Sequence, residues 1–189
     1  MIDTQFSVSD GVVTFTITDR KGQIFTCLVD EADWEKVKSL NWHISKHKAK
    51  GRTLFYVSHS YKLSGKNKSL KLHRFLLNPE RFKLVDHKNG NGLDNRRENL
   101  RESSKAQNAF NQIKISGTSS SFKGVFWRKD LKKFEAYIKT SQTGKPVRKY
   151  LGLFVNEVDA ARAYNEAALT YFGEFARLNE IPRENSDGK

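Results

Sequence analysis

The chain has 189 residues, enough for one ordinary domain or two small ones, and 37% of them are hydrophobic. No apolar run approaches the roughly 20 residues of a membrane-spanning helix, residues 1–19 lack the layout of a secretion signal, and a single cysteine, Cys27, excludes an internal disulfide framework or a cysteine-ligated zinc ribbon. The single cysteine fits a reducing cytoplasm. Because 34 Lys and Arg outnumber 21 Asp and Glu, giving a net charge of +13, we expect a polyanionic partner, most often nucleic acid.

The first elements in chain order are a hairpin and a helix. Residues 12–17 and 24–29 alternate apolar and polar side chains on either side of a short turn, which predicts two antiparallel strands. Asp30 is placed to cap a helix that would bury Trp34 and Val37 on one stripe.

The next stretch is basic and extended. Residues 54–61 and 70–76 are predicted as two further extended segments around a turn at 64–67. No Asp or Glu occurs between residues 36 and 79, whereas Lys and Arg crowd together there. This composition predicts a basic surface for a polyanion, and the alternative is a solvated face without a partner.

The middle of the chain carries a pattern of polar residues at defined spacing. An apolar strand ends in Asp86 and His87, a Gly-rich loop returns the chain, Asn99 lies on the returning strand, and a short helix carries Asn108. Carboxylate and amide oxygens suit one Mg²⁺ or Mn²⁺ ion, and His87 titrates near neutrality, where it can take a proton from water. The alternative is an Asx-rich surface turn in which these side chains only cap the backbone.

This spacing resembles the HNH nuclease motif, in the variant that has Asn in place of the last His. The resemblance covers residues 72–111 closely, and the Leu-His-Arg-Phe segment at its start is similar to the segment before the motif in phage and intron-encoded members. It implies that Asp86 and Asn108 bind one divalent metal, that His87 is the general base, and that Asn99 holds the far nitrogen of the imidazole.

In the last third of the chain, a second set of predicted strands and one helix follows a short polar segment. Residues 115–121 have the small polar composition of a flexible joint. Three strand candidates between residues 125 and 154 predict a meander, and a helix follows that Asn156 caps and Gly173 ends.

Strand parity divides the side chains of this sheet between two faces. Leu151 and Leu153 are predicted to face the helix. The side chains predicted for the open face are Glu135, Tyr137, Lys139, Arg148 and Tyr150.

Residues 122–179 resemble the plant ethylene-response-factor, or Apetala-two, type of DNA-binding domain. The resemblance is carried by motifs such as Phe-Lys-Gly-Val at 122–125, Tyr-Leu-Gly-Leu-Phe at 150–154 and Leu-Asn at 178–179. It implies a three-stranded sheet that enters the major groove. By position, the side chains that would face DNA are Lys123, Arg128, Tyr137, Lys139, Arg148 and Tyr150. The alternative is a small α+β domain that packs on the nuclease or on another protein.

These observations predict an α+β chain in four parts. The parts are a ββα-metal (HNH) nuclease domain at 1–114, a linker at 115–121, an Apetala-two-type DNA-binding domain with a three-stranded antiparallel sheet on one helix at 122–181, and a tail at 182–189. Four arginines of the nuclease part are also expected to contact DNA, namely Arg74, Arg96, Arg97 and Arg101.

The expected function is a metal-dependent, site-directed DNA endonuclease of the homing type that leaves 5′-phosphate and 3′-hydroxyl ends. It would act on double-stranded DNA, with no membrane and no small-molecule substrate, as a monomer or weak dimer in a bacterial cell or phage-infected host. The alternative is a non-catalytic DNA-binding regulator that uses the HNH unit as a scaffold. The intact set of Asp86, His87, Asn99 and Asn108 favours the enzyme, because a scaffold would not need it.

Overall fold

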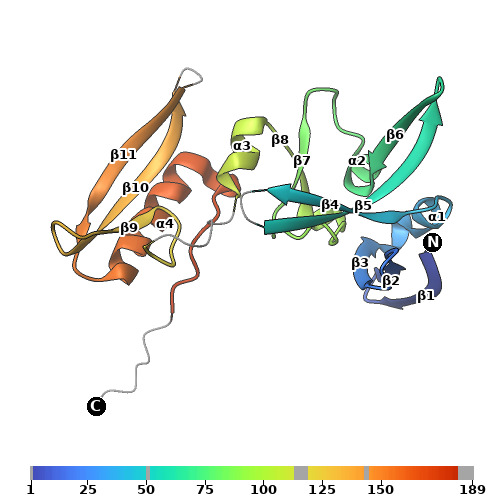
Figure 1. The fold of residues 1–189 in the computed structure, drawn as a ribbon, viewed down its shortest axis with the longest axis horizontal. Coiled ribbons are helices and arrows are strands. Elements are labelled where there is room, and N and C mark those ends of the chain that lie inside the picture. Colours follow the sequence, from blue (N-terminus) through green and yellow to red (C-terminus); the bar gives the residue numbers. More distant parts are fainter. Residues whose placement is uncertain (1, 50–51, 113–118, 143–144, 183–189) are drawn as a thin grey trace, which may run out of the picture. The chain divides into compact units, whose positions relative to one another are not determined.

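The computed structural model describes residues 2–49, 52–112, 119–142 and 145–182 (Figure 1). The chain divides into two compact units, Met1–Lys105 and Ala106–Lys189. Small antiparallel sheets and a few helices build the described parts of both units, so the predicted mixed α+β class is confirmed. No helix among these residues is long and apolar enough to cross a membrane.

The first unit begins with a three-stranded sheet and a helix. Its elements are β1 (Ile2–Ser9), β2 (Val12–Thr18), β3 (Ile24–Asp30) and α1 (Glu31–Lys38). The antiparallel pairing of β2 with β3 confirms the predicted hairpin. Asp30 is the N-cap residue of α1, but its carboxylate makes no cap bond and accepts instead from the backbone N–H of Arg97 at 2.7 Å.

The second sheet of this unit is followed by a short helix. Its elements are β4 (His43–Ala49), β5 (Arg52–Leu63), β6 (Lys66–Lys71) and α2 (Leu72–Leu77). Positive φ angles of 49° at Ser64 and 74° at Gly65 make the two-residue turn between β5 and β6. The predicted extended segment 70–76 is wrong beyond Lys71. Leu72 and Leu76, four residues apart, lie on one face of a helical turn and are both buried in the core.

A two-stranded hairpin completes the first unit. Its elements are β7 (Leu84–His87), the 3₁₀ turn η1 (Arg97–Asn99) and β8 (Leu100–Ser103), after which α3 (Lys105–Phe110) follows. Asn99 therefore ends the turn before the returning strand, whereas the sequence placed it on that strand. The loop between β7 and β8 is fixed to β3, because Leu28 donates to Leu93 O at 3.0 Å and Asn95 N donates to Leu28 O at 2.8 Å.

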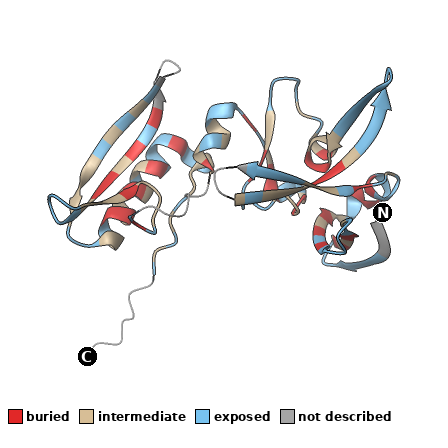
Figure 2. Ribbon diagram, in the orientation of Figure 1, coloured by how far each residue is buried: buried red, intermediate tan, exposed pale blue. Residues whose placement is uncertain are grey.

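One hydrophobic core joins the three sheets of the first unit (Figure 2). The buried side chains are Val13, Phe15, Ile17, Cys27, Val29, Trp34, Val37, Trp42, Val57, Leu72, Leu76 and Leu100. Alternate residues of β2 and β3 point into it, as the period of two predicted. Burial of Leu100 ties the β7–β8 hairpin to the same core, which holds the hairpin in a fixed position.

The second unit is a three-stranded meander covered by one helix. Its elements are β9 (Val125–Arg128), β10 (Lys133–Gln142), β11 (Lys145–Phe154), α4 (Glu157–Phe172) and the 3₁₀ turn η2 (Gly173–Phe175). The strand order is β11-β10-β9, and α4 packs on the sheet (Figure 1). The Asn156 side chain accepts from Val158 N at 2.8 Å, and Gly173 is the C-cap residue, so both predicted helix ends are confirmed.

A β-bulge in this sheet changes the predicted parity. Ala136 pairs with Gly152, but Tyr137 pairs with Tyr150, so Leu151 has no opposite residue. Leu153 then lies opposite Glu135 on the open face, and the predicted inward position of Leu153 is wrong. Phe154 packs on the helix-facing core in its place.

The predicted joint lies partly outside the described residues. This holds for residues 113–118, while 119–121 contact the second unit. Ser119 Oγ accepts from Trp127 N at 2.9 Å, and Ser121 N donates to Glu157 Oε1 at 2.9 Å. These three residues therefore belong to the fold of the second unit.

Candidate active site

Asp86 and His87 lie at the end of β7, the central element of the candidate site. Each keeps 6% of its surface exposed. In the antiparallel register Asp86 is opposite Arg101 and His87 is opposite Leu100. Because neighbouring residues of a strand point to opposite faces, the two side chains enter different surroundings.

The Asp86 carboxylate is paired with Arg101. Its Oδ2 accepts from Arg101 Nε at 3.0 Å and from Nη2 at 2.8 Å, and less than a tenth of either side chain is exposed. A buried pair of this kind is costly to break, since the remaining charge would lose its counterion. Arg101, which the sequence assigned to DNA contact, lies in the interior as the counterion of Asp86.

His87 lies in an aromatic and largely dry environment. Its ring centroid is 4.9 Å from that of His73, at an interplanar angle of 88°, and 6.0 Å from that of Tyr56. Burial lowers the pKa of His87, although a hydrogen bond with Asn95 and the charge of Asp86 act in the opposite direction. The imidazole is therefore neutral near pH 7 and able to accept a proton.

Asn95, not Asn99, is the amide at the His87 ring. The Asn95 Oδ1 lies 3.4 Å from His87 Nε2, and Asn95 is fully buried. The Asn99 side chain donates to Asp94 O at 2.7 Å and accepts from Asn89 N at 3.0 Å, so it holds the loop. Sequence reasoning missed Asn95, although this residue stands inside the Asp-Asn-Arg part of the motif.

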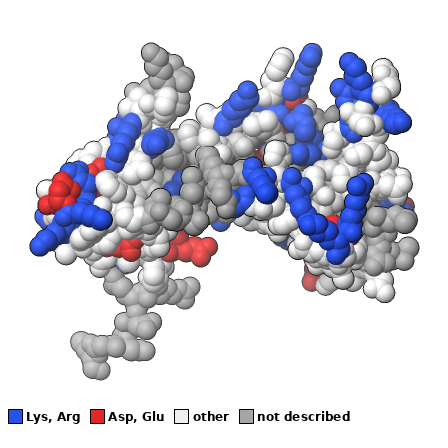
Figure 3. Space-filling model, in the orientation of Figure 1, with Lys and Arg blue, Asp and Glu red and all other residues white. Residues whose placement is uncertain are grey.

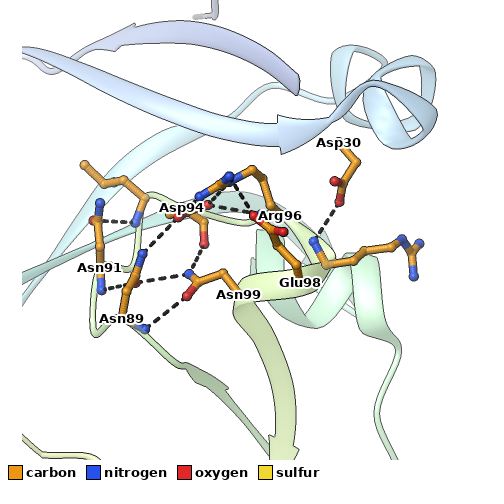
Figure 4. A network of polar contacts seen from close by, with 9 residues as sticks. Asp30, Asn89, Asn91, Asp94, Arg96, Glu98 and Asn99 are labelled. Carbon is orange, nitrogen blue, oxygen red and sulfur yellow. Dashed lines mark hydrogen bonds and ion pairs between the residues drawn. The ribbon is translucent and has the colours of Figure 1, made fainter. Parts of the chain in front are cut away.

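The loop carries a polar network centred on Asp94 (Figure 4). Arg96 donates to Asp94 from Nε at 2.9 Å and from Nη2 at 2.8 Å, and Asn89 Nδ2 donates to the same carboxylate at 2.9 Å. Burial alone would raise the pKa of Asp94, but the hydrogen bonds from Arg96 and Asn89 outweigh it and lower the pKa. Asp94 is an ionised structural centre of the loop.

The other arginines predicted to contact DNA also have partners inside the first unit. Arg97 donates to the buried Asp33 at 2.7 and 2.8 Å, from a site 64 residues away in the chain. Arg74 Nη1 donates to Lys83 O at 2.8 Å. Arg96, as described above, binds Asp94. These contacts hold parts of the first unit together, and DNA contact by the same residues stays a prediction.

Asn108 lies half-buried on α3, within the second unit. Since the two units are described separately, its pairing with Asp86 around a metal stays a prediction. The described residues contain no group of three or more His, Cys, Asp or Glu that could hold an ion. A metal at Asp86 would therefore need amide oxygens and water as further ligands.

On the open face of the second unit, the Glu135 carboxylate forms ion pairs with two arginines that were predicted to contact DNA. Its Oε2 lies 2.9 Å from Arg128 Nη1 and its Oε1 lies 2.7 Å from Arg148 Nη2. The Arg148 guanidinium also lies 3.9 Å from the Tyr137 ring centroid. Glu135 is buried under these side chains, with 8% of its surface exposed.

Strand pairing extends this cluster. Lys139 pairs with Arg148 and Tyr137 with Tyr150, so these residues share the open face, and Tyr150 is 60% exposed. Lys123 is different, because its ammonium donates to Phe110 O and lies 6.0 Å from the ring of Tyr164 on α4. Five of the six side chains predicted to face DNA lie together, and Lys123 contacts the helix side.

Positive charge is spread over both units on the face that Figure 3 shows, in keeping with the net charge of +13. A buried neutral histidine beside a carboxylate is a pair that can take a proton from water, as hydrolytic enzymes require.

Comparison with known proteins gives the family. Residues 81–110 match the HNH endonuclease family. Over 184 residues the chain is 32% identical to an uncharacterised HNH endonuclease of Acanthamoeba polyphaga mimivirus, a match that covers 93% of this chain and 86% of that protein. No solved structure matches. The chain belongs to the HNH endonuclease family, and it is a nuclease whose domain implies a DNA substrate.

Proposed function

We propose that the chain is a metal-dependent, site-directed DNA endonuclease of the homing type, in which the second unit binds duplex DNA and raises the local concentration of the nuclease at its target. It would work as a monomer or weak dimer in a bacterial cell or phage-infected host. The observation that carries the proposal is the buried, neutral His87 beside Asp86 within the family motif.

The donor set fits a divalent cation. Asp86 supplies a carboxylate and Asn108 an amide oxygen, which are the hard ligands that Mg²⁺ and Mn²⁺ prefer. When bound, such an ion would stabilise the charge on the phosphate and on the leaving 3′ oxygen. Such an ion would compete with Arg101, the counterion of Asp86, for this carboxylate.

His87 supplies the proton transfer. With Nε2 beside the Asn95 oxygen, the neutral ring carries its proton on Nε2, so Nδ1 is the basic nitrogen of the ring. Nδ1 accepts a proton from water as the water oxygen attacks phosphorus and the bond from phosphorus to the 3′ oxygen breaks. The 3′ oxygen takes up a proton from solvent water, and His87 later returns its proton to solvent, which leaves a 5′-phosphate and a 3′-hydroxyl end.

The open sheet face of the second unit supports its role in DNA binding. Arg148 stacked on Tyr137 offers a guanidinium of the kind that reads guanine or binds phosphate in a groove. Glu135 holds Arg148 and Arg128 side by side, so their positions are set before DNA binds.

The direct test incubates the full chain with its source genomic DNA and Mg²⁺ and sequences the new ends. We expect cuts at few sites, ends with 5′-phosphate and 3′-hydroxyl groups, and complete loss of cutting when EDTA removes the metal. Binding without any cut, at any metal concentration, would favour the non-catalytic regulator. Cutting that survives EDTA would contradict the metal dependence.

Glu135 offers a separate prediction for the second unit. Glu135→Gln removes the carboxylate that neutralises two arginines, so affinity for scrambled duplex DNA should rise and the salt dependence should steepen by about one unit for each added phosphate contact. Preference for the cut site should fall, because Arg148 is no longer held. Binding of both duplexes is measured at two salt concentrations.

The matched control is Asp130→Asn, which removes the same charge but loosens only Arg128, which keeps its ion pair with Glu135, and leaves Arg148 held. It should raise affinity for scrambled DNA and leave the preference for the cut site unchanged. If both variants kept the parental salt dependence, the open face would not meet DNA.

A further inference from the structure

The outer part of the β5–β6 hairpin, residues 60–69, is exposed at every position; we refer to it as the arm. It extends away from the core of the first unit, in which none of its residues takes part (Figure 2). The arm contains Lys62, Lys66 and Lys68 and no Asp or Glu. An exposed hairpin without core contacts contributes little to folding, so its composition calls for another explanation.

The cations of the arm are uncompensated, unlike the arginines of the motif. Among the described residues no carboxylate pairs with Lys62, Lys66 or Lys68, and the basic side chains are visible on the hairpin in Figure 3. Arg96, Arg97 and Arg101 each bind a carboxylate of the same unit. Only uncompensated cations can replace the counterions of a phosphate backbone without first breaking an ion pair.

Strand register sorts the arm into two different faces. Ser60 pairs with Ser69, and Lys62 pairs with Asn67, so every side chain on one face can donate a hydrogen bond; we refer to it as the donor face. The side chains of Ser60, Asn67 and Ser69 make no hydrogen bond within the part of the chain that the structure describes. The opposite face carries Tyr61, Leu63, Lys66 and Lys68.

The donor face continues into the candidate active site. Lys71, next on this face, pairs with Ser58, and its ammonium lies 4.1 Å from the ring centroid of Tyr56. The same Tyr56 ring lies 6.0 Å from the ring of His87. From Ser58 to Lys62 the strand advances about 13 Å, the rise of about four base pairs of duplex DNA.

We propose that the donor face of the arm follows the DNA backbone next to the cleaved bond, with Lys71 and Lys62 each neutralising a phosphate and Ser60, Asn67 and Ser69 donating to phosphate oxygens. The inference rests on the proposed function, because it takes duplex DNA as the ligand. It assigns backbone contact in the first unit to the arm and removes it from the arginines of the motif.

The test compares two single-charge changes on opposite faces of the arm, Lys62→Gln and Lys68→Gln, in the full chain. Binding is measured on sheared genomic duplex DNA between 50 and 200 mM salt, in the presence of EDTA and in the His87→Ala background, so that cleavage does not enter. We expect Lys62→Gln to decrease the slope of log affinity against log salt by about one unit and Lys68→Gln to keep the parental slope.

Each other outcome overturns part or all of the proposal. Equal losses in the two variants would show that only net charge matters, and an unchanged slope for Lys62→Gln would show that the arm does not meet DNA. With His87 restored, saturating Lys68→Gln should cleave at the parental single-turnover rate, because Lys68 lies on the face of the arm that is turned away from DNA in this proposal. A parent that binds but never cuts contradicts the proposed function and leaves the binding comparison valid.

Discussion

His87→Ala is expected to lower the single-turnover rate of DNA cleavage by about 10²–10⁴-fold, the usual contribution of a general base. DNA affinity should stay close to the parental value, because the imidazole is buried and its proton transfer stabilises only the transition state. The measurement is cleavage of the mapped site at saturating protein, together with binding of the same duplex in EDTA.

The control for this change is His47→Ala, which removes an exposed histidine of β4. It should cleave at the parental rate at saturating protein. If His87→Ala also cut at that rate, His87 would not be the base. If it lost affinity in parallel with rate, His87 would act in DNA binding.

The second large effect is on stability, and it comes from His73. This residue is 5% exposed, its ring lies edge-on to His87, and it makes no hydrogen bond to any described residue. Burial lowers the pKa of His73 to about 2, with smaller contributions from His87, Lys71 and Arg74. The folded protein therefore keeps His73 neutral, whereas the unfolded chain takes up a proton below about pH 6.5.

Because the unfolded state binds more protons, the free energy of unfolding falls as the pH drops below about 6.5, by about 1.4 kcal/mol per pH unit from His73 alone. Urea unfolding at pH 7 and pH 5 should show a loss of about 2 kcal/mol from this residue. The His73→Phe variant keeps a ring at the site and removes that contribution. Its stability should therefore fall less between the two pH values than that of the parent.

The other histidines with lowered pKa, His43 and His87, are present in both proteins, so the difference between the two pH profiles isolates His73. Identical profiles would mean that His73 titrates in the folded state as it does in the unfolded chain. His59→Phe would be a poor comparison, because the half-buried His59 donates from Nδ1 to Asn41 O at 2.8 Å. The control for the stability measurement is again a substitution of the exposed His47.

Local pattern was sufficient for several parts of the fold. Alternation predicted β2 and β3, and the cap at Asn156 and the glycine at 173 predicted both ends of α4, because these signals depend on residues close in sequence. The adjacent Asp86 and His87 could be recognised from their order and spacing, and the family comparison covers that segment. The metal, the boundaries of the parts and the Apetala-two-type role of the second unit stay predictions.

Tertiary structure decided what depends on contacts between distant residues. Helix α2 forms where an extended segment was expected because Leu72 and Leu76 reach a common core, and Asn95 replaces Asn99 at His87 because β3 fixes the loop. A one-residue bulge moved Leu153 to the open face, which no local signal marks.

The ion pairs likewise depend partly on composition and partly on the tertiary structure. The excess of Lys and Arg was visible in the composition, but which cations remain available to DNA depended on where the few carboxylates lie in space. Asp33 takes Arg97 from 64 residues away, and Asp86 takes Arg101 across the hairpin. The lysines of the arm stay uncompensated among the described residues because no acidic side chain occurs on that hairpin, and folding brings none to it.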